Sequence, residues 1–399
     1  MSIKRSFSKL SYLTLGLFVF LTIITTKIYA QEIPLPLPPS IDAKSWVLLD
    51  YDSGRVLISK NPDERRAPAS LTKLMTEYVV ASQIKIGAIH MNDLVRISKH
   101  AWLGGGAKTD GSTSFLKVHS EVSLENLLHG MIIQSGNDAA IALAEHVSGS
   151  EEAFTHLMNA YAKKLGMKNT HYSDASGYPV ADHYSSARDI AILSRALIHD
   201  FPKEYAISSI KEFKWNGIKQ RNRNALLWQD SRIDGIKTGH TAAAGYCLDA
   251  SELRGHSRLI AVVLGASTNK ARAESAMSLL EYGFQYFKTY KLYEPSKPII
   301  TSRLWEGKKK TLQVGVQKDV LVTIGKGRYG DIKTYVNLPT SLIAPYKKGT
   351  PIGTLKITLE GKTLKSVPLV ALSDAPRGSF FSREYDSILL WFHTHLGKS

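Results

Sequence analysis

Strand patterns at two distant places in the chain, with helical patterns between them, constrain the fold most strongly. Residues 45–59 have the composition of two short strands joined by a turn that contains Gly54. The stretch that follows places apolar residues at helical spacing, for example at 123–133 and 151–165. Strands are predicted again at 233–241, 246–251 and 259–265. Both groups fit one domain if distant segments pair in a single mixed sheet, so the sequence predicts an α/β (α+β) fold.

The pattern changes near the segment Glu294-Pro-Ser-Lys-Pro298, which has the composition of a linker. Beyond it, short runs rich in β-branched residues alternate with turn signals such as Glu360-Gly361. These runs are predicted strands at 311–316, 320–324, 332–337, 352–359 and 363–372. The sequence therefore predicts a first domain over residues 31–293 and a small all-β domain over residues 297–378.

The last segment, residues 379–399, places apolar side chains on one face of a predicted helix. The apolar positions are Phe381, Tyr385, Ile388, Leu389, Phe392 and Leu396. The segment is too short, and too often interrupted by polar residues, to cross a bilayer. Trp391 and the excess of basic residues in the preceding domain favour an amphipathic helix that lies in a membrane surface. The alternative is a terminal helix that packs on its own domain.

The N-terminus has the three parts of a secretory signal. Basic residues precede an apolar run over residues 10–24, and Ala30 offers a small residue for cleavage. We therefore predict a signal peptide over residues 1–30 and export of the rest of the chain; an uncleaved anchor is the alternative. Removing the four basic residues of the signal lowers the formal charge from +16 to +12, which favours anionic partners or a membrane surface. Export argues against nucleic acid as a partner.

One short pattern carries the elements of a nucleophilic active site. Ser70 and Lys73 are three residues apart, so a helix would place the hydroxyl and the amine on one face. Pro68 is poorly tolerated inside a helix, so the helix should begin close to Ser70 and leave the Ser70 N–H unpaired at its positive end. A serine hydroxyl is a weak nucleophile until a base removes its proton. Lys73 can be that base only if burial, or a cation such as Lys237, lowers its pKa.

Ser-x-x-Lys alone decides nothing, because the pattern also begins at Ser6, Ser82, Ser114, Ser208 and Ser267. Two further motifs distinguish the copy at Ser70 from the others. Ser135-Gly136-Asn137 falls at a turn between two apolar helices, and Lys237-Thr238-Gly239 falls on a predicted strand. The Ser135 hydroxyl is suited to pass a proton between Lys73 and a leaving amine, and the Asn137 amide can hold a substrate backbone. Lys237 and Thr238 suit a terminal carboxylate, one by charge and the other by a hydrogen bond.

With this trio in order, the chain resembles the low-molecular-mass penicillin-binding proteins of the serine-type D-alanyl-D-alanine carboxypeptidase family. The resemblance covers most of the chain and includes Asn222-Arg223-Asn224, Asp234 to Thr241, the signal, the basic β domain and the C-terminal helix. Ala225 stands where proteins of this family usually have glycine. The resemblance implies a transpeptidase-like fold, with an antiparallel sheet flanked by helices, a helical subdomain and an appended β-sandwich.

The resemblance also implies an activity and further site residues. It implies removal of the terminal D-alanine from peptidoglycan pentapeptides through a Ser70 acyl-enzyme, inhibition by β-lactams, and a location on the periplasmic face of the inner membrane. The oxyanion would lie between the backbone N–H groups of Ser70 and His240, beside Gly239, and Arg272 would be a second contact for the carboxylate. We predict no cofactor and no metal, since His393 and His395 are two residues apart and point to different helix faces.

Three alternatives remain open from the sequence. A DD-endopeptidase that cuts peptidoglycan cross-links would use the same chemistry. A class A β-lactamase would need a glutamate that activates the deacylating water, and the only match to its motif, at Glu212, lies too close to Lys237. A non-catalytic wall-binding protein would not require an intact trio.

Overall fold

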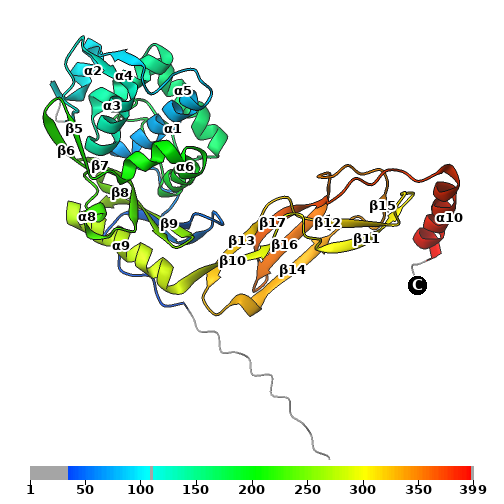
Figure 1. Cartoon of the computed structure of the whole chain (residues 1–399). Coiled ribbons are helices and arrows are strands. Elements are labelled where there is room, and N and C mark those ends of the chain that lie inside the picture. Colours follow the sequence, from blue (N-terminus) through cyan, green and yellow to red (C-terminus); the bar gives the residue numbers. More distant parts are fainter. Residues whose placement is uncertain (1–34, 108–110, 397–399) are drawn as a thin grey trace, which may run out of the picture. The chain divides into compact units, whose positions relative to one another are not determined.

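The structure, a computed structural model, describes residues 35–107 and 111–396 (Figure 1). The signal peptide predicted at 1–30 lies outside the described residues. The same is true of residues 397–399 of the predicted C-terminal segment.

A five-stranded antiparallel sheet forms the centre of the first domain. Its strands lie in the order β2-β1-β9-β8-β7, which leaves β7 at an edge. They are β1 (Ser45–Asp50), β2 (Val56–Lys60), β7 (Ile233–Thr241), β8 (Gly245–Arg254) and β9 (Ser257–Ala266). β1 pairs with β9 over its whole length, which joins the two predicted groups of strands and confirms the α/β (α+β) fold.

The two faces of this sheet bury different side chains, because successive residues of a strand point to opposite sides. Val47 and Leu49 of β1 pack into a large apolar cluster with helices of the domain. Trp46 and Leu48 pack on the other face with α9 (Asn269–Tyr286). Helices therefore cover both faces of the sheet (Figure 1).

Most of the helices lie between β2 and β7 in the sequence, as the periodicity predicts. The longer ones are α1 (Lys73–Lys85), α4 (Asn137–Ser148), α5 (Glu151–Leu165) and α6 (Ala187–Asp200). The shorter ones are α2 (Lys99–Trp102), α3 (Leu124–His129), α7 (Pro202–Tyr205) and α8 (Leu226–Gln229). Two small two-stranded sheets, absent from the sequence prediction, pair β3 (Leu94–Arg96) with β4 (Glu121–Ser123) and β5 (Glu212–Trp215) with β6 (Ile218–Arg221).

The C-terminal part is built from β-strands that pack around one apolar cluster. A six-stranded sheet has the order β14-β16-β17-β12-β11-β15, and β10 pairs with β13 separately. Val322 of β13 and Val314 of β12 belong to the same cluster, so the two sheets pack face to face. The strands are β10 (Phe287–Tyr293), β11 (Ile300–Trp305), β12 (Thr311–Gly315), β13 (Val320–Gly325), β14 (Ile332–Asn337), β15 (Leu342–Ile343), β16 (Pro351–Leu359) and β17 (Lys362–Ala371).

The pairing of β10 corrects the predicted boundary between the domains. The sequence places residues up to 293 in the first domain and predicts a helix over 271–287. In the structure, α9 ends at Tyr286 and β10 begins at the next residue. Because β10 pairs with β13, the β-rich part begins at Phe287 instead of near Lys297.

The C-terminal helix α10 (Phe380–Leu396) contacts the β domain through polar side chains, and Asp386 makes the most buried of the described contacts. Asp386 is only 1% exposed. Its Oδ2 accepts hydrogen bonds from Glu306 N at 2.9 Å and from Lys310 Nζ at 2.8 Å. The helix therefore does pack on its own domain, through a polar contact.

Most of the described apolar side chains of α10 are exposed. Phe381 is 83% exposed, and Phe380, Tyr385, Ile388, Trp391 and Phe392 are also exposed. No helix in residues 35–107 or 111–396 is both long and apolar enough to cross a membrane.

Candidate active site

The sequence motifs meet at one pocket of about 550 Å³, although they lie on separate elements. Its walls include Ser70, Ser135, Asn137, Thr238, Gly239, His240 and Arg272. Lys73 and Lys237, at 1% and 3% exposure, are buried directly around it. The structure thus brings together every predicted site residue.

The nucleophile lies on a 3₁₀ turn, Ala69–Thr72, that leads into α1 at Lys73. The helix start predicted close to Ser70 is therefore correct, with a tighter first turn. Ala69 has a φ of 49°, a strained value for a residue with a side chain. The edge strand β7 passes beside this turn, because a Cβ on Gly239 would lie 3.2 Å from Ser70 N. The absence of a side chain at Gly239 permits this approach.

Three oxygen atoms surround the amine of Lys73. Its Nζ lies 3.0 Å from Ser70 Oγ, 2.8 Å from Asn137 Oδ1 and 2.7 Å from the carbonyl oxygen of Ser176. The last two are acceptors only, so each must receive an N–H from the lysine. A neutral amine has two N–H groups and one lone pair. With both N–H groups engaged, the lone pair faces the hydroxyl of Ser70.

The environment of Lys73 favours the neutral amine. Its pKa is lowered to about 7, against 10.5 for an ordinary lysine, chiefly by burial and to a smaller extent by Arg223. The carboxylates of Asp174 and Asp138 act in the opposite direction. Burial also lowers the pKa of Lys237, followed by repulsion from Lys73. A base at Lys73 requires a lowered pKa, and burial is the main cause of the lowering.

The second motif forms a tight turn that aims two polar side chains at the pocket. Ser135 has a left-handed φ of 69°, and the next residue leads into α4, which begins at Asn137. Gly136 is required for space, since a Cβ there would lie 1.9 Å from Ser114 Oγ. Ser135 Oγ is buried and has no hydrogen-bond partner within residues 35–107 and 111–396. The hydroxyl is therefore available to a substrate, and the structure does not link it to Lys73.

The third motif and Arg272 form the opposite wall. Arg272 of α9 donates hydrogen bonds from Nη1 to Gly239 O at 2.9 Å and Cys247 O at 3.2 Å, which fix its guanidinium beside the strand. The ring of His240 is exposed and stacks on Tyr246 with centroids 4.1 Å apart.

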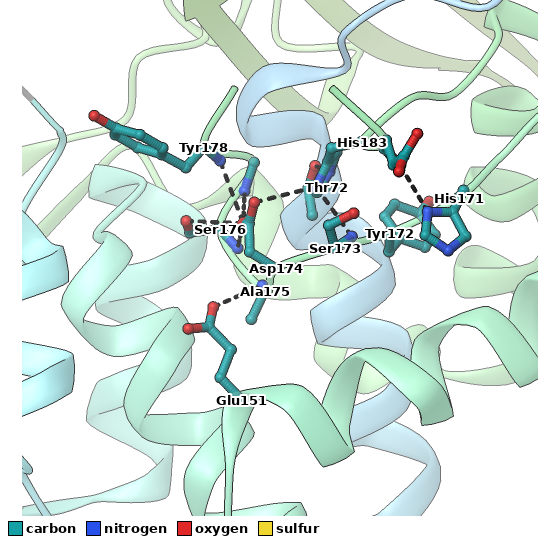
Figure 2. A network of polar contacts seen from close by, with 12 residues as sticks. Thr72, Glu151, His171, Tyr172, Ser173, Asp174, Ala175, Ser176, Tyr178 and His183 are labelled. Carbon is teal, nitrogen blue, oxygen red and sulfur yellow. Dashed lines mark hydrogen bonds and ion pairs between the residues drawn. The ribbon is translucent and has the colours of Figure 1, made fainter. Parts of the chain in front are cut away.

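A loop that the sequence did not single out completes the site. Asp174 accepts hydrogen bonds from the backbone N–H groups of Ser176 and Gly177, and lies 3.1 Å from His183 Nδ1 (Figure 2). The same loop supplies the Ser176 carbonyl that contacts Lys73. A backbone carbonyl has no signature in residue type, so only the fold reveals this contact.

No group of three His, Cys, Asp or Glu side chains in the described part of the chain could hold a metal ion. His393 instead lies against Trp305, with ring centroids 5.8 Å apart.

Comparisons with known proteins agree with this geometry. Residues 33–268 match the Peptidase S11 model, D-alanyl-D-alanine carboxypeptidase, and residues 287–377 match the penicillin-binding protein 5 C-terminal domain. The D-alanyl-D-alanine carboxypeptidase DacC of Escherichia coli is 45% identical over 363 residues, 90% of this chain and 91% of the relative. Penicillin binding protein 5 from Haemophilus influenzae has a TM-score of 0.81 at 43% identity and covers 86% of this chain and 99% of its own. Penicillin-binding protein D2 from Listeria monocytogenes, solved in an ampicillin-bound form, has a TM-score of 0.56 at 29% identity, with 62% and 99% coverage.

Proposed function

Because the chain belongs to the Peptidase S11 family of D-alanyl-D-alanine carboxypeptidases and is a serine-type hydrolase, we propose that Ser70, Lys73 and Ser135 carry out its acyl transfer. One observation carries this assignment. The amine of Lys73 lies 3.0 Å from Ser70 Oγ, and its two other partners are acceptors that leave only the lone pair for the hydroxyl.

In the first step, Lys73 takes the proton of Ser70 while Oγ attacks the carbonyl carbon between the two D-alanines. The backbone N–H groups of Ser70 and His240 stabilise the oxyanion of the tetrahedral intermediate. Removal of one such donor typically costs about 3 kcal/mol of transition-state stabilisation. The C–N bond then breaks, and the proton held by Lys73 passes to the leaving amine.

The unpaired hydroxyl of Ser135 is suited to that transfer, because it is buried in the pocket wall and can both donate and accept. D-Alanine leaves, and its place is open to water. Water then attacks the Ser70 ester, with Lys73 again as the base, and releases the shortened peptide.

The other wall recognises the terminal carboxylate. Thr238 can donate a hydrogen bond, and Lys237 and Arg272 supply positive charge. Burial lowers the pKa of Lys237 in the free protein. A bound carboxylate would favour the ammonium form again, so recognition of the substrate would restore the charge.

The substrate we propose is the pentapeptide stem of peptidoglycan, with β-lactams as inhibitors that acylate the same Ser70. Intact-protein mass spectrometry after exposure to a β-lactam should show one stable adduct, which peptide mapping places on Ser70. A D-alanyl-D-alanine peptide should release free D-alanine. Both results should disappear in Ser70→Ala, while Ser82→Ala, on α1 and outside the pocket, should keep them. D-Alanine release by Ser70→Ala would contradict the assignment.

DD-Endopeptidase activity is a second candidate, supported by a hollow that adjoins the pocket. This hollow, of about 610 Å³, shares Arg223, His240 and Arg272 with the catalytic pocket and extends to Trp228. It offers room and positive charge for the second stem of a cross-link. The same assay, run on purified cross-linked and uncross-linked muropeptides, separates the two activities. Release of monomers without free D-alanine would favour the endopeptidase and contradict the carboxypeptidase.

We also propose that the exported enzyme rests on the periplasmic face of the inner membrane through α10. The exposed aromatic and aliphatic side chains of α10 support this proposal. Burial of one large apolar side chain is worth about 2 kcal/mol, so several together suffice for reversible binding.

Phe381→Asp should weaken binding of the protein to phosphatidylglycerol–phosphatidylethanolamine vesicles, measured by co-sedimentation, by about tenfold or more. It removes an apolar side chain that is 83% exposed, the most exposed among those described on α10. The matched control is Tyr335→Asp, which changes an exposed aromatic residue of β14 in the β domain by the same charge. Equal binding by the two variants would refute the membrane contact of α10.

A further inference from the structure

The carboxylate of Asp174 organises the loop that reaches the catalytic lysine (Figure 2). Its Oδ1 accepts hydrogen bonds from the backbone N–H groups of Ser176 at 2.7 Å, Gly177 at 2.6 Å and Tyr178 at 3.2 Å. Three converging amides fix the backbone on both sides of Ser176. The carbonyl oxygen of Ser176 is thereby held 2.7 Å from Lys73 Nζ.

The other oxygen of Asp174 faces a buried histidine. Oδ2 lies 3.1 Å from His183 Nδ1, and the His183 side chain is 1% exposed. On the opposite side of the ring, Nε2 lies 2.7 Å from Thr72 Oγ1. Thr72 belongs to the 3₁₀ turn that carries Ser70 and directly precedes Lys73. Asp174 and His183 therefore link the loop to the nucleophile turn.

Close packing makes this link rigid. A Cβ on Gly177 would lie 1.9 Å from the carbonyl oxygen of Ala69, so the loop lies directly on the nucleophile turn. From the other side, Glu151 of α5 accepts a hydrogen bond from Ala175 N at 2.9 Å (Figure 2). A shift of the loop would therefore move the Ser176 carbonyl away from Lys73.

We propose that Asp174 and His183 are positioning residues of the acyl transfer: they hold the Ser176 carbonyl against Lys73 and so direct the lysine lone pair to Ser70. This inference rests on the proposed role of Lys73 as the base. Neither side chain lines the catalytic pocket, and each reaches the site through the loop or the nucleophile turn.

The charge of Asp174 adds an electrostatic effect to the geometric one. Burial raises the pKa of Asp174, but His183 and the amides of Gly177 and Ser176 outweigh it and hold the value at about 2, so the group is anionic. The anion raises the pKa of Lys73 against the effect of burial, as Asp138 does, whereas Arg223 lowers it. Loss of the charge at residue 174 should therefore lower the pKa of Lys73.

Two substitutions separate the geometric effect from the electrostatic one. Asp174→Ala removes the oxygen that holds the three amides, and we expect the acylation rate at high pH to fall by about 10²-fold. Asp174→Asn keeps an oxygen for these amides, so most of that rate should return. Because it removes the charge, the rise of its rate with pH should begin at lower pH than in the wild type. The rate is measured by intact-protein mass spectrometry with a β-lactam and normalised to the folded fraction from circular dichroism.

Asp189→Ala is the matched control. Asp189 is also a buried carboxylate, which accepts hydrogen bonds from Asn169 N and Thr170 Oγ1 away from the loop at 174–178. The Asp189→Ala substitution should lower the thermal stability. It should leave the acylation rate of the folded protein and the pH profile of that rate unchanged.

Two variants of His183 test the same positioning role if Asp174→Ala does not fold. His183→Asn retains a polar group facing Asp174, whereas His183→Leu loses the contacts to both Asp174 and Thr72. The rate should fall further in the leucine variant. Wild-type rates in Asp174→Ala or His183→Leu, or an unmoved pH profile in Asp174→Asn, would overturn the inference. A wild-type rate in Lys73→Met would instead overturn the proposed base, so the two failures are distinguishable.

Discussion

Replacement of Lys73 by methionine is expected to reduce the acylation of Ser70 by about 10³-fold, within the usual contribution of a general base. Methionine has similar length but has neither a lone pair that takes the serine proton nor an N–H group. In the wild type, the pKa of Lys73 is about 7, so the amine is neutral above that pH and protonated below it. The wild-type rate should therefore increase as the pH rises through about 7, and the residual rate of the variant should lack this increase.

The measurement is the rate of β-lactam adduct formation, followed by mass spectrometry at pH values on both sides of the transition. Lys85→Met is the matched control, because Lys85 lies on the same helix α1 but is exposed at its C-terminal end. It should keep the rate and the pH profile of the wild type. An unchanged profile in Lys73→Met would show that another group takes the proton.

Gly177→Ala is expected to cause a second large loss, although residue 177 carries no functional group. The added methyl group would lie 1.9 Å from the carbonyl oxygen of Ala69, so the loop or the nucleophile turn must move. The left-handed φ of 91° adds backbone strain. A misplacement of about 1 Å at a reacting centre can cost about 10²-fold in rate, and we expect a loss of that size in acylation.

Gly166→Ala isolates the backbone strain from the steric clash. Gly166 has a similar φ of 80°, but a Cβ there would meet no atom within 4 Å. The control should lose about 1 kcal/mol of unfolding free energy and keep the acylation rate of the folded protein. Thermal melts and acylation rates of both variants test this, and equal rates would show that the clash does not reach Ser70.

The sequence predicts the main elements of the fold because their periodicities are strong and local. The predicted helix at 151–165 and the strand at 233–241 match α5 and β7 at both ends. β10 was missed because it follows α9 without a turn signal, so its first residue continued the predicted helix. The hairpin of β5 and β6 was missed although its local signal is present. Phe213 and Trp215 alternate with polar residues, and Asn216-Gly217 forms the turn with positive φ values of 49° and 79°.

The candidate site could be predicted in so far as it consists of side chains. A hydroxyl at Ser70, an amine at Lys73 and an amide at Asn137 have chemical identities that a motif records. The Ser176 carbonyl has none, and its place at Lys73 depends on how the loop folds around Asp174. Asp386 shows the same limit on α10, because only the fold shows that it is buried against Lys310.

The two hydrogen-bond acceptors of Lys73 differ in whether a substitution can remove them, because one is a side-chain oxygen and the other is a main-chain oxygen. A single codon change can delete the Asn137 oxygen. No codon change at position 176 can delete a main-chain carbonyl, so a small residue such as alanine there would keep the contact. Mutations that move this carbonyl away from the Lys73 amine must therefore lie at neighbouring positions that shape the loop, such as 174, 177 and 183. Substitutions that disturb Lys73 through the Ser176 carbonyl are therefore expected at residues that shape the loop, and not at residue 176 itself.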